Sequence, residues 1–256
     1  MGAMTDPLDV DAPMTTARTN ERLRAAGPLG TTDPRRTELF RVAAAARLLI
    51  DRLAATDAPG EVLAAAALDL EAAAEHLHGF RQGSIYEFSE AANAGAEPSA
   101  FFDHSPLIGK ANPLAPPIVL EQVDDRIIGR ARFGVAYEGP PGCVHGGYVA
   151  AAFDELLGAT QGLGGQPGMT GTLTVRYRRP TPLLADLTFE GWLLRVEGRK
   201  TFVAGRCLAD GEVTAEAEGI FVSVAVSKFL ALREAREERA ERERERRAPD
   251  AAPDPG

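Results

Sequence analysis

The chain has 256 residues, 45% of them hydrophobic and 25% charged, a composition typical of a soluble globular protein. A net charge of −9 argues against a broad nucleic-acid-binding surface. The two cysteines, Cys143 and Cys207, are too few for a disulfide framework or a metal-ligand set. No segment approaches the ~18 consecutive apolar residues of a membrane span, and the N-terminus lacks a secretory pattern. We therefore expect a cytoplasmic protein with no membrane span, nucleic-acid partner or metal.

Two amphipathic helices are predicted after a polar, proline-punctuated segment, 1–32, that we expect to be disordered. Asp33 and Pro34 are typical of an N-cap and a first helical residue. Over about 34–55, one stripe of apolar residues recurs at helical spacing: Leu39, Val42, Ala43, Ala46, Leu49, Ile50 and Leu53. A second helix, ending near Leu77, has an inward stripe: Val62, Leu63, Ala66, Leu70, Ala73 and Leu77. Together they predict a helical hairpin, 33–79, docked on the main domain or on a second subunit.

The remaining pattern predicts an antiparallel sheet around one central helix, an α+β fold. An irregular lead-in, 80–117, is rich in glycine, proline and serine. From Ile118 the apolar period becomes two, and strand-like runs cover 118–124, 126–136, 170–179, 185–197, 200–210 and 212–224. Asp124-Asp125 and Asp210-Gly211 are the expected hairpin turns. The main domain is therefore predicted over 118–227.

The last segment, 228–256, is dominated by charge. Arginine and glutamate alternate in it, and pairs such as Glu238–Arg242 and Glu243–Arg247 would support a solvated helix by about 0.3 kcal/mol each. A frayed, disordered tail is the alternative.

The apolar run between the second and third strands, YVAAAFDELLG (148–158), contains two adjacent acids, Asp154 and Glu155. Its alanine and leucine content indicates a helix, and it is apolar on nearly every side, as in a helix wrapped by its own domain. An acid buried in such a helix is costly unless it has a partner. Acids in such surroundings often have shifted pKa values and functional roles.

The two acids differ in their neighbours on the helical wheel. Asp154 shares its face with small residues only, which are Gly147, Ala150, Ala151 and Gly158. Such a face leaves space for a substrate. Glu155 is rotated from it by about 100°. The pattern favours Asp154 as the reactive acid, with Glu155 and a purely structural carboxylate at a subunit seam as alternatives.

Three stretches, HGGYVAAAFDELLGA (145–159), MTGTLTVRYRRPTPL (169–183) and VEGRKTFVAGRCLADGEVTAEAEGIFVSV (196–224), resemble a known family. They are similar to the hot-dog-fold acyl-CoA thioesterases of the phenylacetic-acid-degradation (PaaI) type, within the four-hydroxybenzoyl-CoA thioesterase superfamily. The resemblance covers about 118–224. It implies a hot-dog fold, to which this chain adds an N-terminal helical hairpin.

The resemblance also implies an activity, the hydrolysis of an acyl-CoA to free acid and CoA without a cofactor. Asp154 would be the general base or the nucleophile. The expected assembly is a homodimer or a dimer of dimers with sites at the subunit interface. A non-catalytic acyl or acyl-CoA binding module is an alternative, since the fold does not fix the function. A hydratase or dehydratase is another, although no second histidine follows His145.

The start of the central helix is the predicted oxyanion site, because its N–H groups are unpaired and its dipole is positive there. Gly147 N–H is the predicted donor, and Gly146 is expected to contact the substrate, since glycine lets a carbonyl approach closely. Both glycines could instead serve only a sharp turn. The resemblance implies that His145 orients this turn or contacts the thioester carbonyl.

Further candidates come from the later strands. Thr170 matches the position where some relatives have a threonine that positions the attacking water, supplied in hot-dog dimers by the other subunit. Thr172 and Thr174 lie nearby, and strands favour threonine in any case. Basic residues at strand ends are the candidates for binding CoA phosphates: Arg178, Arg179, Arg199 and Lys200. Each of them alone could equally be a solvated surface charge.

Overall fold

A computed structural model describes residues 33–80, 98–116, 118–166 and 168–224, with a few helical residues between 235 and 242. The predicted disorder of 1–32, the lead-in residues 81–97 and the Glu243–Arg247 pair lie outside the described residues. Within the described ranges, no helix is long and apolar enough to cross a membrane.

The main domain is a six-stranded antiparallel sheet, which confirms the predicted fold class. Its strands are β1 (Val119–Val123), β2 (Arg126–Ala131), β3 (Gly168–Tyr177), β4 (Leu187–Glu197), β5 (Lys200–Ala209) and β6 (Glu212–Ser223). They follow the order β1-β2-β4-β5-β6-β3, so β1 and β3 are the edges. Each strand overlaps a predicted run, and the hairpin residues Asp124 and Asp210 have the positive φ of tight turns.

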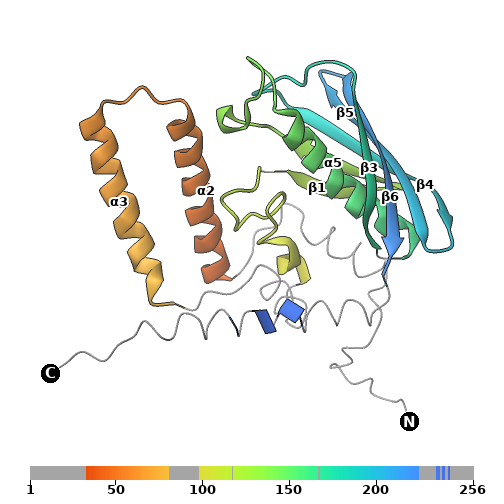
Figure 1. Ribbon diagram of the computed structural model, residues 1–256, viewed down its shortest axis with the longest axis horizontal. Coiled ribbons are helices and arrows are strands. Elements are labelled where there is room, and N and C mark those ends of the chain that lie inside the picture. The colour runs from red at the N-terminus through yellow and green to blue at the C-terminus, as the bar shows by residue number, and fades with distance from the viewer. Residues whose placement is uncertain are drawn as a thin grey trace, which may run out of the picture.

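The central helix, α5 (Gly146–Gln161), lies against one face of this sheet (Figure 1). Its buried side chains are Val149, Ala152, Phe153, Leu156, Leu157, Thr160 and Gln161. Phe153 packs edge-to-face on Phe189 of β4 at 5.5 Å. The helix is therefore the centre of the core, as the apolar run predicted.

Glycines in the sheet let α5 approach it closely. Gly191 of β4 and Gly205 of β5 are paired neighbours in the ladder. A methyl group added at Gly191 would overlap the Thr160 hydroxyl of α5, and one at Gly205 would lie 3.1 Å from Leu156. Gly129 and Gly219, on the flanking strands, also contact leucines of α5. The helix thus lies in a shallow trough that only residues without a side chain can form.

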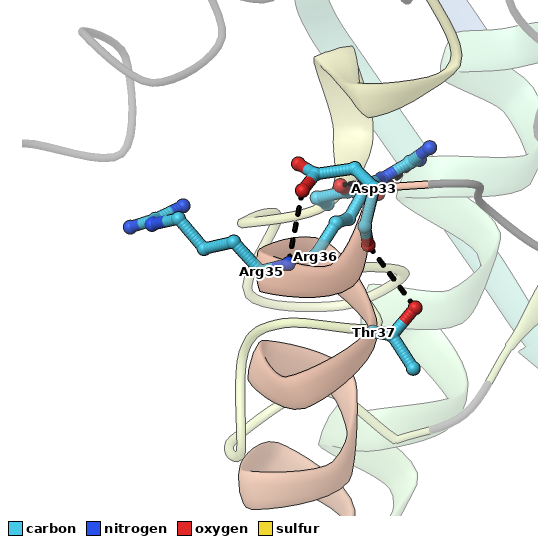
Figure 2. A network of polar contacts seen from close by, with 5 residues as sticks. Asp33, Arg35, Arg36 and Thr37 are labelled. Carbon is cyan, nitrogen blue, oxygen red and sulfur yellow. Dashed lines mark hydrogen bonds and ion pairs between the residues drawn. The ribbon is translucent and has the colours of Figure 1, made fainter.

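The helix α2 (Pro34–Ala54) begins as predicted. Asp33 is its N-cap and accepts a hydrogen bond from Arg35 N at 2.9 Å, while the Thr37 hydroxyl donates to the Asp33 carbonyl (Figure 2). Arg36 makes a two-pronged ion pair with Asp103, at 2.6 and 2.9 Å. The two side chains are only 13% and 10% exposed. This pair attaches α2 to the described part of the lead-in.

A second set of contacts docks α2 beside the central helix. Arg47 donates to the carbonyls of Lys110 and Asn112 in the lead-in. Asp51 accepts from Ala136 N at 3.3 Å, in the short 3-10 helix η2 (Val135–Tyr137) that precedes α5. The helix α2 therefore docks on the main domain, which is one of the two predicted alternatives.

The helix α3 (Gly60–His78) follows the predicted bounds but not the predicted burial. Its stripe was expected to face inward, yet no residue of α3 is buried. Figure 1 shows α3 on the outer side of α2, away from the sheet. The expectation of an inward stripe is wrong for this chain alone, because helical spacing tells which residues share a face but not what covers that face.

The described part of the lead-in is irregular, as predicted, and contains a short 3-10 helix, η1 (Pro98–Phe102). Phe102 and Ile108 pack on the core of the main domain. In the charged tail, Arg242 forms the predicted i,i+4 pair with Glu238 at 3.4 Å, and both residues are helical.

Substitution of Gly191 by alanine should destabilise the fold by about 1–3 kcal/mol, because the new methyl group would force α5 away from the sheet. Shortening Thr160 to alanine in the same chain should recover part of this loss, since it removes the overlapping hydroxyl. Urea unfolding of the two single variants and the double variant measures the coupling between the sites.

Gly60→Ala is the matched control, because a methyl group at Gly60 would meet nothing within 4 Å. Equal effects of Gly191→Ala and Gly60→Ala, or additive losses in the double variant, would contradict the close-packing account.

Candidate active site

Asp154 and Thr170 meet within one chain. The Thr170 hydroxyl donates a hydrogen bond to Asp154 Oδ1 at 2.9 Å. Asp154 lies on α5 and Thr170 on the edge strand β3, so the sheet and the helix each supply one member of the pair. Among the described residues, no other group bonds to this carboxylate, which leaves Oδ2 open. The resemblance had implied that the threonine reaches the site from another subunit, whereas here both residues belong to the same chain.

A bulge in β3 explains why Thr170, and not a neighbouring threonine, faces the acid. The pairing of β3 with β6 shifts register between Thr170 and Thr172, so Gly171 is an extra residue in the strand. A bulge breaks the alternation of side chains and re-aims one of them. The choice among Thr170, Thr172 and Thr174 could not be made from the sequence, because a period of two places all three on one side.

The small-residue face of α5 stays partly open, as predicted. Asp154, Ala150, Ala151 and Gly158 are half-buried, and Gly147 is exposed, whereas the opposite face of α5 is packed on the sheet. Space therefore exists beside the carboxylate.

His145 is the N-cap of α5, and its side chain accepts a hydrogen bond from Gly147 N–H through Nδ1 at 3.0 Å. An Nδ1 that accepts carries no proton, so the neutral ring has its proton on Nε2 and can donate from there. This supports the predicted role of His145 in orienting the turn. It also makes Nε2–H an additional donor at the helix start.

The same contact changes the expectation for the oxyanion donor. Gly147 N–H, the predicted donor, is engaged by His145. Tyr148 N–H donates to the His145 carbonyl at 2.9 Å. Within the part of the chain that the structure describes, Gly146 N–H has no hydrogen-bond partner, so it is the open backbone donor of this first turn.

The turn that opens α5 is held by contacts that the sequence did not single out. Tyr177, at the end of β3, donates its hydroxyl to the Gly146 carbonyl at 2.7 Å. His145 N donates to the Tyr137 carbonyl at 2.9 Å, and the Tyr137 ring packs edge-to-face on Tyr148. Tyr177 belongs to the stretch MTGTLTVRYRRPTPL (169–183) that carries the resemblance, and this was the only sequence signal that could have pointed to it.

Glu155, the alternative acid, points to different surroundings. The pKa of its carboxyl is raised from 4.5 to about 7, chiefly by burial and also by the neighbouring charge of Asp154, while a hydrogen bond with Ser105 of the lead-in opposes the shift. Glu155 thus lies under the lead-in, whereas Asp154 faces open space. Ser105 carried no sequence signal, because lead-in contacts depend on the folded chain.

The four predicted phosphate-binding residues do not form one cluster within a chain. Arg178 and Arg179 follow the end of β3 and lie near Thr214 of β6, whereas Lys200 is opposite Val222. Thr214 and Val222 are about 25 Å apart along β6, and so are the two sets of basic residues beside them. Arg178 and Arg179 also pair with Glu216 and Glu212 of β6, and Arg199 donates to the Ser223 carbonyl. Of the described side chains, none bonds to Lys200.

No described residues form a metal centre, since no group of three histidine, cysteine, aspartate or glutamate side chains comes together in residues 33–80, 98–116, 118–166 or 168–224.

Comparison with known proteins identifies the family. The family model described as the thioesterase superfamily matches residues 141–216, which include the opening turn, α5 and most of the sheet. The crystal structure of protein RHA08564, a thioesterase superfamily protein, is 38% identical, with a TM-score of 0.60. The match covers 72% of this chain and 94% of that protein.

The chain belongs to the thioesterase superfamily. Its sheet and central helix therefore have the hot-dog fold that the resemblance implied. The similarity to RHA08564 extends beyond the sheet and its helix, because residues 118–224 make up less than half of the chain. The narrower resemblance to the PaaI type stays a prediction.

Curated relatives point to the same superfamily. The mouse acyl-coenzyme A thioesterase THEM4 is 32% identical over 111 residues, or 43% of this chain and 48% of that protein. The human acyl-coenzyme A thioesterase THEM5 is 30% identical over 95 residues, or 36% of this chain and 38% of that protein. The chain spans about half the length of the curated relatives it matches, or less.

The fold should lose stability as the pH rises from about 4.5 to about 7. The folded state favours the protonated carboxyl of Glu155, and this carboxyl loses its proton over that pH range. Glu155→Gln keeps the shape and removes the titration. At pH 8 the variant should gain up to about 3 kcal/mol over the wild type, and at pH 4 almost nothing. Urea unfolding across this pH range measures the difference.

Glu71→Gln on the exposed α3 is the control, and its stability should follow the wild-type pH curve. If Glu155→Gln also follows that curve, the buried-carboxyl account fails.

Proposed function

We propose that this thioesterase-superfamily chain hydrolyses an acyl-CoA thioester to a free acid and CoA, with Asp154 as the reacting acid. The observation that supports this most is the Asp154–Thr170 pair, held at 2.9 Å on an open, small-residue face of α5. The names of the relatives, both acyl-coenzyme A thioesterases, agree with this substrate class. A cytoplasmic location, where acyl-CoA esters occur, is part of the same proposal.

The carboxylate can act by either of two routes. As general base, Asp154 Oδ2 takes a proton from water while the water oxygen bonds to the thioester carbon. As nucleophile, Oδ2 itself bonds to that carbon and forms an anhydride, which water then cleaves. In both, the carbon–sulfur bond breaks, and the CoA thiolate leaves and takes up a proton. Thr170 fixes Oδ1 and so turns Oδ2 toward the substrate.

The negative oxygen that forms on the carbonyl needs donors near the start of α5. Gly146 N–H is open, the helix dipole is positive at that end, and the His145 Nε2–H can add a further donor. Gly147 N–H would join them only if the His145 ring rotates away from it. The hydroxyl of Tyr177 holds the Gly146 carbonyl and keeps this turn in place.

Edge pairing of β3 would complete the site with a second subunit. Most of this ten-residue strand is exposed, and its free edge can add a second copy. In an antiparallel pair about a twofold axis, the beginning of one β3 lies beside the end of the other. The partner's Arg178 would then approach Arg199 and Lys200. Basic residues that lie far apart within one chain would thus come together between two chains and could bind the CoA phosphates.

Asp154→Asn should lower the rate of CoA release by roughly 10²–10⁴-fold, because the amide can neither accept the proton nor attack. The assay measures free CoA from a panel of acyl-CoAs at saturating substrate. An unchanged rate would show that Asp154 does not do the chemistry. Acyl-CoA binding without CoA release by either protein would support a binding module instead.

Thr170→Val should lower kcat by about tenfold with little change in KM, because it removes the bond that orients the carboxylate. Thr170→Ser is the matched control and should keep most of the rate, since it retains the hydroxyl. If valine and serine behave alike, the hydroxyl is not what matters at this position.

A further inference from the structure

The helix α3 exposes an apolar stripe that nothing in the described chain covers. This α3 stripe comprises Val62, Leu63, Ala66, Leu70, Ala73 and Leu77. Leu63, Leu70 and Leu77 are 40%, 43% and 56% exposed. The two helices α2 and α3 hold nine of the nineteen large apolar side chains exposed among the described residues. Such a concentration on one part of a surface marks an interaction site.

The α3 stripe is regular and free of charge. Its residues follow helical spacing over the whole length of α3, and the acids nearest its two sides are Asp69, next to Val62, and Glu71. Leu68 is exposed on the opposite face of the helix. The stripe therefore has the form of a helix-packing surface, not of scattered surface leucines.

The charges on the two helices are opposite. The helix α3 contains Glu61, Asp69, Glu71 and Glu75 and no lysine or arginine. The helix α2 contains five arginines against Glu38 and Asp51. Arg36 and Arg47 dock α2 on its own domain, while the other three, Arg35, Arg41 and Arg52, are exposed.

We propose that the α2–α3 hairpin is an interface between two copies of this chain, in which the α3 stripe of each copy packs on α2 of the other. Packing α3 on α3 would bring acids together, whereas packing it on α2 brings opposite charges together. The acidic border of the stripe also disfavours an anionic membrane surface. Exposed Val42, Ile50 and Leu53 lie on one side of α2 and give it an apolar surface to match.

A twofold axis makes this contact self-complementary and closed, since each copy gives one acidic and one basic helix. The result is a four-helix bundle. It lies on a different part of the chain from the β3 edge. The proposal is therefore independent of the proposed activity and of β3 pairing, and both contacts together would produce a dimer of dimers.

Light scattering after size exclusion tests the contact on the full chain. Leu63→Glu/Leu70→Glu should halve the particle mass relative to the wild type. Leu68→Glu/Ala72→Glu, on the opposite face of α3, is the matched control and should leave the mass unchanged. Circular dichroism and CoA release show whether each variant still folds and works. A monomeric wild type, or an equal mass for the stripe variant, overturns the proposal.

A charge swap tests which helices meet. Arg41→Glu/Arg52→Glu makes both helices acidic. In a second preparation, Asp69→Arg/Glu71→Arg replaces the acids nearest the stripe with arginines and so sets like charges against the basic α2. Each variant alone should show the halved mass, and an equimolar mixture should recover the wild-type mass. Failure of the mixture to recover it would overturn the packing of α3 on α2.

Discussion

The close approach of α5 to the sheet is the constraint on which the rest of the molecule depends. The helix can pack as it does because Gly191 and Gly205, paired on neighbouring strands, have no side chains beneath it. One face of α5 is thereby buried against the sheet and fixed in rotation. The opposite face, with Asp154, is left open. The position of the Asp154 carboxylate thus follows from where the sheet lacks side chains.

The site shows how one helix can separate two adjacent acids. Asp154 and Glu155 are neighbours in sequence, yet the helical rotation between them places one beside Thr170 and the other under the lead-in. The first keeps a free oxygen, and the second has its carboxyl pKa raised to about 7, chiefly by burial. A change at Glu155 therefore acts through charge and packing, while under the proposed function a change at Asp154 acts on the reaction itself.

Much of this could be predicted from the sequence, and the failures have physical causes. The strands, α5 and the Asp33 cap were predicted, because periodicity and capping are local. Thr170 could not be separated from Thr172, since a bulge is set by the pairing of two strands. The distance between Arg178 and Lys200 depends on sheet register. The α3 stripe was predicted as a face, but its surroundings are a property of the assembly.

The docking of α2 bears on which residues belong to the unit that folds cooperatively. Arg36 and Asp103 form an ion pair that is largely buried. Asp51 accepts a hydrogen bond from η2, directly before the turn that opens α5. A buried ion pair that loses one partner leaves the other charge stranded, at a cost of about 3–5 kcal/mol. The cooperatively folding unit therefore includes α2 and the described lead-in as well as the region that resembles the superfamily. Truncation of the chain before residue 118 would remove part of that unit.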